Sequence, residues 1–264
     1  MGENLILAVT PGQAALAAGC GLPLAHLSYR VSGGPHLVRA NSPVGPAKDG
    51  LMGMDAEKLT EGGDCAAFCN EVLRECAARS FSGAVCRFGS RPTPALGELA
   101  AKLDEVFDRR GLSLYVSEAC AGAAPHAKVL IPTALSGGSL RARLETALGQ
   151  CGPGRVALWA ERSAEDFLLP SPSGTGAPLT AEELSRRREE HGANVFFSDE
   201  LCAHYFTYRT GDQAHFVLFD DVGSIRKKLL IGRQLGVETA FLPYGQTADL
   251  LGDLLGRDGD RKKA

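Results

Sequence analysis

The 264-residue chain has one tryptophan, three methionines and no apolar run long enough to cross a membrane. The apolar stretch near its start, residues 5–9, is also too short for the core of a signal peptide, and no lysine or arginine precedes it. Asn-x-Ser/Thr acceptors for glycosylation are absent. We therefore expect a cytoplasmic chain without membrane association, or a form from which an export signal has been removed.

Neither sign of charge dominates, because 28 basic residues stand against 31 acidic ones and the formal net charge is −3. Such a balance gives no reason to expect nucleic acid or an anionic membrane as a partner. The Walker loop, the Gly-x-Gly-x-x-Gly fingerprint and the Gly-x-Ser-x-Gly elbow are all missing, and the six histidines show no metal-ligand spacing. The sequence therefore predicts no cofactor and no bound metal.

The eight cysteines include no pair with the Cys-x-x-Cys spacing of a zinc or redox site. Cys65, Cys69 and Cys76 follow one face of a predicted helix. We interpret them as small apolar residues on a buried face, with metal binding as the alternative. A large number of free thiols is typical of a reducing compartment.

Short apolar or β-branched runs alternate with longer amphipathic stretches, a rhythm that predicts βα units and a parallel sheet. About 250 residues is a typical size for a (β/α)8 barrel. We predict one α/β domain of this type, a TIM barrel over residues 1–256, followed by a disordered charged tail over 257–264. Its eight strands are expected at residues 5–9, 25–31, 51–54, 83–88, 112–116, 128–131, 155–160 and 239–242.

One region, at about residues 171–219, interrupts this rhythm. A Pro/Gly/Ser loop leads into a helix over 180–190, where Thr180 and Glu183 have the spacing of a capping box. Three short stretches, at residues 195–197, 204–209 and 215–219, then have the residue pattern of antiparallel strands. The sequence therefore predicts a small α+β insertion between the seventh and eighth barrel strands.

Three segments of the C-terminal third carry a family resemblance through their order and spacing. They are Ala157-Leu-Trp-Ala-Glu-Arg-Ser-Ala-Glu-Asp-Phe-Leu-Leu-Pro170, then His191-Gly-Ala-Asn-Val, and finally Tyr205-Phe-Thr-Tyr208 with Phe216-Val-Leu-Phe-Asp-Asp-Val-Gly-Ser-Ile-Arg. Together they resemble the spore cortex and germination-type family 18 glycoside hydrolases, which are chitinase-like. The resemblance implies a (β/α)8 barrel and a ligand that contains N-acetylglucosamine, such as a peptidoglycan-like or chitin-like glycan.

The chain departs from this family where the family's chemistry resides. The family's fourth strand carries D-x-x-D-x-D-x-E, and here the four acidic positions are Ser82, Val85, Arg87 and Gly89. In the family the last Glu protonates the leaving oxygen and the Asp before it orients the substrate's N-acetyl group, which attacks the anomeric carbon. Gly89 has no proton to give, and the charge of Arg87 opposes an oxocarbenium-like centre.

Active sites of barrels form at the C-terminal ends of the strands, so acids there are the candidates for a rebuilt site. Glu118, after the fifth strand, is the best substitute for the missing catalytic acid. Asp55 after the third strand or Glu161 after the seventh could supply the second acid. The simpler interpretation is that each of these three acids is a surface carboxylate or an ion-pair partner of Arg87 or Arg162. The residues predicted to bind a ligand are Asp55, Arg87, Glu161, Asp166 and Tyr244.

Three hypotheses follow for function. The leading one is a catalytically degenerate family member that binds an N-acetylated glycan, or a protein partner, without cleaving anything. The second is an active glycoside hydrolase that uses Glu118. The third keeps the barrel but assigns it a different role, as a scaffold for protein interaction or as a site for another small molecule, because one fold hosts many functions.

Overall fold

The computed structural model describes residues 4–40, 49–56, 59, 63–89, 93–171 and 174–256. The chain divides into two compact units. The first combines Met1–Ile131, Ala147–Trp159 and Gly236–Gly245, and the second combines Pro132–Thr146, Ala160–Leu235 and Gln246–Ala264. The charged tail predicted at 257–264 lies outside the described residues.

Eight parallel strands form a closed barrel in the first unit, because β1 pairs with β2 on one side and with β14 on the other. This confirms the predicted (β/α)8 barrel, including its weak third strand. In barrel order the strands are β1 (Asn4–Val9), β2 (Leu24–Ser32), β4 (Leu51–Ala56), β5 (Gly83–Phe88), β6 (Ser113–Ser117), β7 (Lys128–Pro132), β8 (Val156–Trp159) and β14 (Thr239–Pro243). A short β3 (His36–Arg39) pairs antiparallel with β2 as a hairpin.

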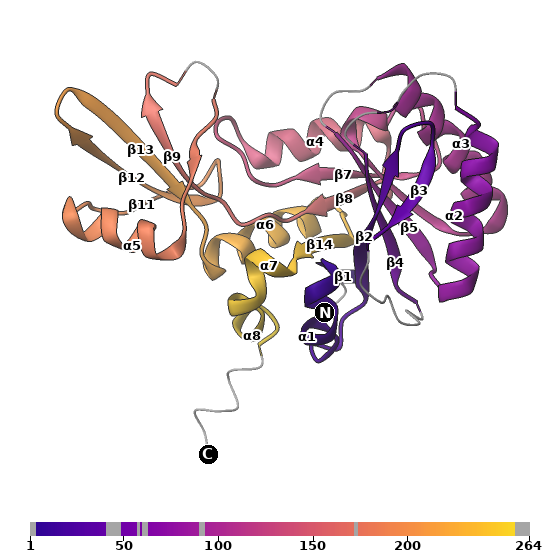
Figure 1. Ribbon diagram of the computed structural model, residues 1–264. Helices are drawn as coiled ribbons and strands as arrows, with labels where there is room; N and C mark the ends of the chain where they lie inside the picture. Colours follow the sequence, from indigo (N-terminus) through magenta and orange to yellow (C-terminus); the bar gives the residue numbers. More distant parts are fainter. Residues whose placement is uncertain are drawn as a thin grey trace. The chain divides into compact units, whose positions relative to one another are not determined.

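Helices connect these strands, and in the first unit α2 and α3 lie side by side along the outside of the barrel (Figure 1). Local sequence sets their ends. Asp64 caps α2 by accepting hydrogen bonds from two backbone amides, and α3 begins with Pro94 after the cap Thr93 and ends at Gly111, which has φ +64°. The helices outside the insertion are η1 (Pro11–Gln13), α1 (Ala14–Ala18), α2 (Cys65–Arg79), α3 (Pro94–Arg110), η2 (Glu118–Cys120), α4 (Leu140–Cys151), α6 (Val222–Gln234), α7 (Tyr244–Thr247), η3 (Ala248–Leu250) and α8 (Leu251–Leu254).

The cysteines of α2 lie largely on its buried face, as predicted. Cys69 and Cys76 are buried, and burial raises the pKa of the Cys69 thiol to about 11 and that of the Cys76 thiol to about 12. All eight cysteines of the chain carry free thiols.

None of the helices in the described part of the chain is both long and apolar enough to span a membrane.

Side chains from every strand fill the interior of the barrel. The ring of Phe241 lies 4.9 Å from Tyr115 and 5.8 Å from Trp159 between centroids, so three aromatic rings pack together. Trp159, the single tryptophan, is only 5% exposed and is a core residue. The interior residues are Ile6, Ala8, Ala25, Leu27, Leu51, Val85, Tyr115, Leu130, Ala157, Trp159 and Phe241. The barrel is therefore a packed core with its open surface at the strand ends.

The second unit contains the predicted α+β insertion between barrel strands β8 and β14. Its antiparallel sheet has the order β10 (Ala177–Pro178), β9 (Ala164–Leu169), β13 (Gln213–Phe219), β12 (Ala203–Thr210) and β11 (Phe196–Ser198), with helix α5 (Ala181–Glu190). The capping box of α5 is present, since the Thr180 amide donates to Glu183 Oε2 and the Glu183 amide donates to Thr180 Oγ1. Strand β9 was not predicted, because the insertion was expected to begin only at about residue 171.

A buried ion pair joins β13 to α6 in the second unit. Lys228 Nζ lies 2.7 Å from Asp220 Oδ2, which also accepts a hydrogen bond from the Ser163 amide, and neither side chain is more than 1% exposed. The next residue, Asp221, caps α6 through the Ser224 amide. The Asp220-Asp221 pair, which resembles a catalytic pair in sequence, therefore has a structural role.

We predict that Lys228→Met lowers the free energy of unfolding by about 3–5 kcal/mol, because it leaves the Asp220 carboxylate buried without its cation. Chemical denaturation followed by circular dichroism measures the change. The matched control is Lys227→Met, whose side chain is 38% exposed and pairs with Asp199. An exposed pair contributes at most about 1 kcal/mol. Equal losses in the two variants would contradict the prediction.

A second prediction concerns His26 on β2, which is 8% exposed and packs against the Phe81 ring. Burial lowers the pKa of His26 below its ordinary value of 6.5. Below about pH 6.5, His26 therefore binds a proton more readily in the unfolded chain than in the folded chain. This difference lowers the free energy of unfolding as the pH falls. We expect His26→Gln to lose less stability than the wild type between pH 7 and pH 5. The exposed His36→Gln is the control, and identical pH slopes for wild type and His26→Gln would show that His26 contributes nothing.

Candidate functional site

Three charged residues stand side by side at the C-terminal ends of neighbouring barrel strands. Arg30 of β2 is in register with Asp55 of β4, and Asp55 is in register with Arg87 of β5. Register partners in a parallel sheet point to the same side, about 4.8 Å apart from strand to strand. The side chains therefore form a row of alternating charge, plus, minus, plus, at the end of the barrel where active sites form.

A β-bulge in β2 brings Arg30 into this row. Leu27 is in register with Gly53 and Tyr29 with the next residue of β4, so Ser28 is an extra residue. Strand residues alternate between faces, so without the bulge Tyr29 would stand in register with Asp55 and enter the barrel. Instead Tyr29 packs outside, where its hydroxyl donates a hydrogen bond of 2.8 Å to Glu75 Oε1.

The row lines a cleft of about 610 Å³ in the first unit. This volume lies within the usual range for small-molecule sites. The described residues that line it are Arg30, Val31, Ser32, Gly33, Asp55, Ala56, Arg87 and Gly89. Two guanidinium groups and one carboxylate give this lining a formal charge of +1, so the cleft offers a cationic, hydrogen-bonding surface.

Arg87 is held by two contacts at the centre of this site. Its Nε lies 3.7 Å from Asp55 Oδ1, and its guanidinium carbon lies 4.8 Å from the centre of the Trp159 ring. The side chains of Arg87 and Asp55 are 40% and 42% exposed, so both remain open to solvent. Trp159 thus supports the cation from the barrel interior by a cation–π contact.

The four positions where the resemblance expects acids separate into two pairs. Ser82 bonds through its hydroxyl to the backbone carbonyls of Asp49 and Gly50, and Val85 is fully buried in the barrel interior. Arg87 and Gly89 line the cleft. The end of β5 therefore carries a cation and a glycine at the two positions where the resemblance implies an aspartate and a glutamate.

The structure places the other two candidates of the first unit at the ends of other barrel strands, Glu118 after β6 and Tyr244 after β14. Glu118 is exposed and opens η2, directly after β6, and it is not among the residues that line the cleft. The preceding Ser117 donates a hydrogen bond of 2.7 Å to the Phe88 carbonyl, which ties the ends of β6 and β5 together. Tyr244 is half-buried and begins α7 directly after β14.

Glu161 and Asp166 belong to the second unit, and Asp166 is buried within its sheet. The Tyr208 hydroxyl donates to Asp166 Oδ2 at 2.8 Å, His215 Nδ1 lies 3.0 Å from Asp166 Oδ1, and Arg187 of α5 forms an ion pair with the same carboxylate. At 6% exposure, Asp166 holds β9, β12, β13 and α5 together. Glu161, just after β8, is half-buried.

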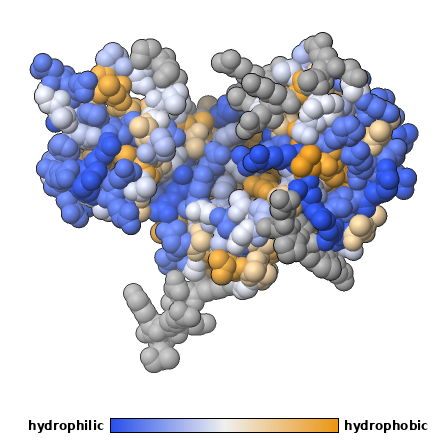
Figure 2. All heavy atoms as spheres, in the orientation of Figure 1, coloured by the Kyte–Doolittle hydropathy of each residue, from blue (hydrophilic) through white to orange (hydrophobic). Residues whose placement is uncertain are grey.

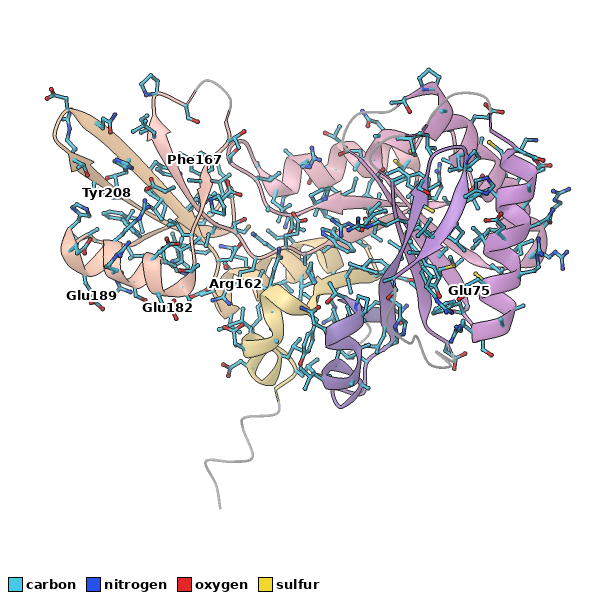
Figure 3. All side chains as sticks on the ribbon, in the orientation of Figure 1. Glu75, Arg162, Phe167, Glu182, Glu189 and Tyr208 are labelled. Carbon is cyan, nitrogen blue, oxygen red and sulfur yellow. The ribbon has the colours of Figure 1, made fainter. Side chains whose placement is uncertain are left out.

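The insertion's sheet has two different faces. Tyr208 lies on the α5 side, and Glu182 and Glu189 point from α5 away from the sheet (Figure 3). The surface over α5 is mostly hydrophilic (Figure 2). The opposite face carries neighbouring aromatic rings with centroids 5.3–6.2 Å apart, namely Phe167, Phe216, Tyr205 and Phe196. The aromatic residues of this region therefore divide between two faces and do not form one cleft.

The sequence matches no model of a known protein family and no curated protein. Its fold does match solved structures. The spore cortex-lytic enzyme SleL of Bacillus megaterium QM B1551 aligns with a TM-score of 0.67 and 16% identity over 95% of this chain and 73% of that one. A chitinase from Chromobacterium violaceum ATCC 12472 aligns with a TM-score of 0.66 and 14% identity over 92% of this chain and 95% of that one.

The Ostrinia furnacalis Group IV chitinase is also similar, with a TM-score of 0.64 and 14% identity over 95% of this chain and 96% of that one. Identities this low show the fold alone. The chain therefore has the fold of the family 18 glycoside hydrolases, which is the fold that the sequence resemblance implied.

We predict that Arg87→Met changes the fluorescence of Trp159, because it removes the cation from the ring face. The chain has one tryptophan, so the emission spectrum reports on this ring alone. The expected cost in stability is small, about 0.5–1 kcal/mol for an exposed cation–π contact. Arg39→Gln, on the neighbouring hairpin strand β3, is the control and is expected to leave the spectrum unchanged. An unchanged spectrum in Arg87→Met would mean that the cation does not rest on the ring.

Proposed function

We propose that this chain is a catalytically inactive barrel of the family 18 type that binds a glycan containing N-acetylglucosamine without cleaving it. The observation that carries the proposal is the end of β5, where Arg87 and Gly89 line the cleft in place of an aspartate and a glutamate. The SleL enzymes and chitinases that share the fold are named for cortex lysis and chitin cleavage, which makes a related glycan the first ligand class to consider.

Electrostatics argue against hydrolysis at this cleft. Cleavage of a glycosidic bond passes through an oxocarbenium-like state, which negative charge stabilises and positive charge destabilises. The described lining residues supply one carboxylate, Asp55, and Arg87 already lies beside it. The single carboxylate is thus engaged with a cation and has no second described acid beside it in the lining.

The lining of the cleft suits binding. Guanidinium groups, the Ser32 hydroxyl and the Asp55 carboxylate are the donors and acceptors that sugar hydroxyl and acetamido groups need. Gly33 and Gly89 have no side chains, so backbone is open to a ligand along two sides. The alternative of a rebuilt hydrolase finds less support, because Glu118 lies outside the lining and would need a second acid.

We predict that N-acetylglucosamine oligomers bind at micromolar to millimolar concentrations and are not cleaved. Long incubation at high protein concentration, followed by mass spectrometry, tests for cleavage, and Trp159 fluorescence with calorimetry measures binding. Cleavage that disappears in Glu118→Gln would overturn the proposal in favour of a rebuilt hydrolase. If the oligomers are neither bound nor cleaved, the proposal is overturned in favour of a scaffold role.

A further inference from the structure

We infer that the cleft selects a glycan bearing a carboxylate, with Arg30 as the residue that receives this group. The inference rests on the proposed function and deepens it, because it names the chemical class of sugar that the site prefers. The two arginines of the row have different surroundings, and this difference assigns their roles.

Arg87 is already engaged. It lies between Asp55 and the Trp159 ring, so its charge is partly balanced and its position is fixed from two sides. Arg30 is exposed, and among the described residues its guanidinium has no ion-pair or hydrogen-bond partner. Among the described residues that line the cleft, Arg30 therefore supplies the positive charge that no ion pair balances.

An uncompensated guanidinium discriminates between ligands. A neutral sugar that covers Arg30 removes water from the guanidinium and supplies no opposite charge in its place. The desolvation of the cation then lowers the binding free energy of the sugar. A carboxylate on the sugar replaces that water with charge-assisted hydrogen bonds, and the planar guanidinium can make two of them in parallel. The bulge at Ser28 is what brings this group into the cleft, since it moves Tyr29 outside and Arg30 in.

The proximity of Asp55 adds a restriction on geometry. Asp55 stands one strand away from Arg30 and repels an anion, while its pairing with Arg87 reduces this repulsion. A carboxylate is therefore favoured on the Arg30 side of the row, beside Ser32 and Gly33. A sugar with a carboxylate on a short ether arm, such as N-acetylmuramic acid, has the required chemistry, with its neutral ring left to occupy the rest of the cleft.

The experiment compares three disaccharides against the full chain by calorimetry and Trp159 fluorescence. They are N-acetylglucosaminyl-N-acetylmuramic acid, its neutral methyl ester, and di-N-acetylchitobiose. We expect the acid to bind about tenfold to a hundredfold more tightly than its methyl ester, which matches it in shape and differs in charge. Added salt should weaken the binding of the acid and leave the binding of the two neutral disaccharides unchanged.

Two substitutions assign the effect to one residue. Arg30→Gln should abolish the preference for the acid over its ester, so that the ratio of the two affinities falls to about one, and Arg30→Lys should restore part of the preference. Arg39→Gln, on neighbouring β3 and outside the cleft lining, should change neither affinity. Thermal unfolding of each variant checks that the fold is intact.

Several outcomes would overturn the inference, and they separate it from the proposed function. Equal binding of acid and ester, or equal weakening of both by Arg30→Gln, would leave glycan binding in place and remove Arg30 as the selector. Tighter binding of N-acetylglucosamine 6-phosphate than of the muramic acid disaccharide would identify phosphate as the preferred anion. Failure of all three disaccharides to bind would overturn the proposed function and the inference with it.

Discussion

One extra residue in β2 decides which side chain enters the mouth of the barrel. A closed parallel barrel has little freedom in register, because every strand is paired on both sides. Inserting Ser28 exchanges the faces of the residues that follow, so Tyr29 joins the outer layer against Phe81 and Arg30 joins the row with Asp55. Gly53 makes room for this arrangement, since a Cβ there would lie 2.5 Å from Leu27 Cδ2. The positive charge of the cleft thus depends on the register of β2, because the bulge at Ser28 is what places Arg30 there.

Several residues in the segments that carry the family resemblance stabilise the fold through helix caps and buried ion pairs. Asp221 and Ser224 form the capping box of α6, and Lys228 forms the buried pair with Asp220. Asp166 likewise satisfies partners on two strands and a helix. Buried pairs and caps of this kind constrain residue type tightly, because removing one partner leaves a charge or a backbone group without compensation. They mark the fold and leave the chemistry of the cleft free to differ.

This explains how much the sequence could predict. Periodicity, caps and turn residues act over a few positions, so the strands of the barrel, the capping box at Thr180 and the ends of α3 were all visible. The positions of Asp55 and Arg87 at the ends of β4 and β5 could be predicted for the same reason, because strand ends follow from strand positions. Arg30 was missed, because β2 reads as an uninterrupted strand and no local signal marks the bulge. The burial of Asp166 was missed too, since three partners from 21 to 49 residues away create it.

The contact between Arg87 and Trp159 limits what the end of β5 can hold. An aromatic ring below a strand end can support either a sugar face or a cation, because both bind to the π-face of the ring. Here the cation occupies that face, and Asp55 fixes it there. The position that would bear developing positive charge in a hydrolase is thereby already positive. If the proposed function holds, an acid introduced at Gly89 would lie two residues from the Arg87 cation at the same strand end, and we expect the two groups to form an ion pair. Restoring hydrolysis would then require changes at both positions.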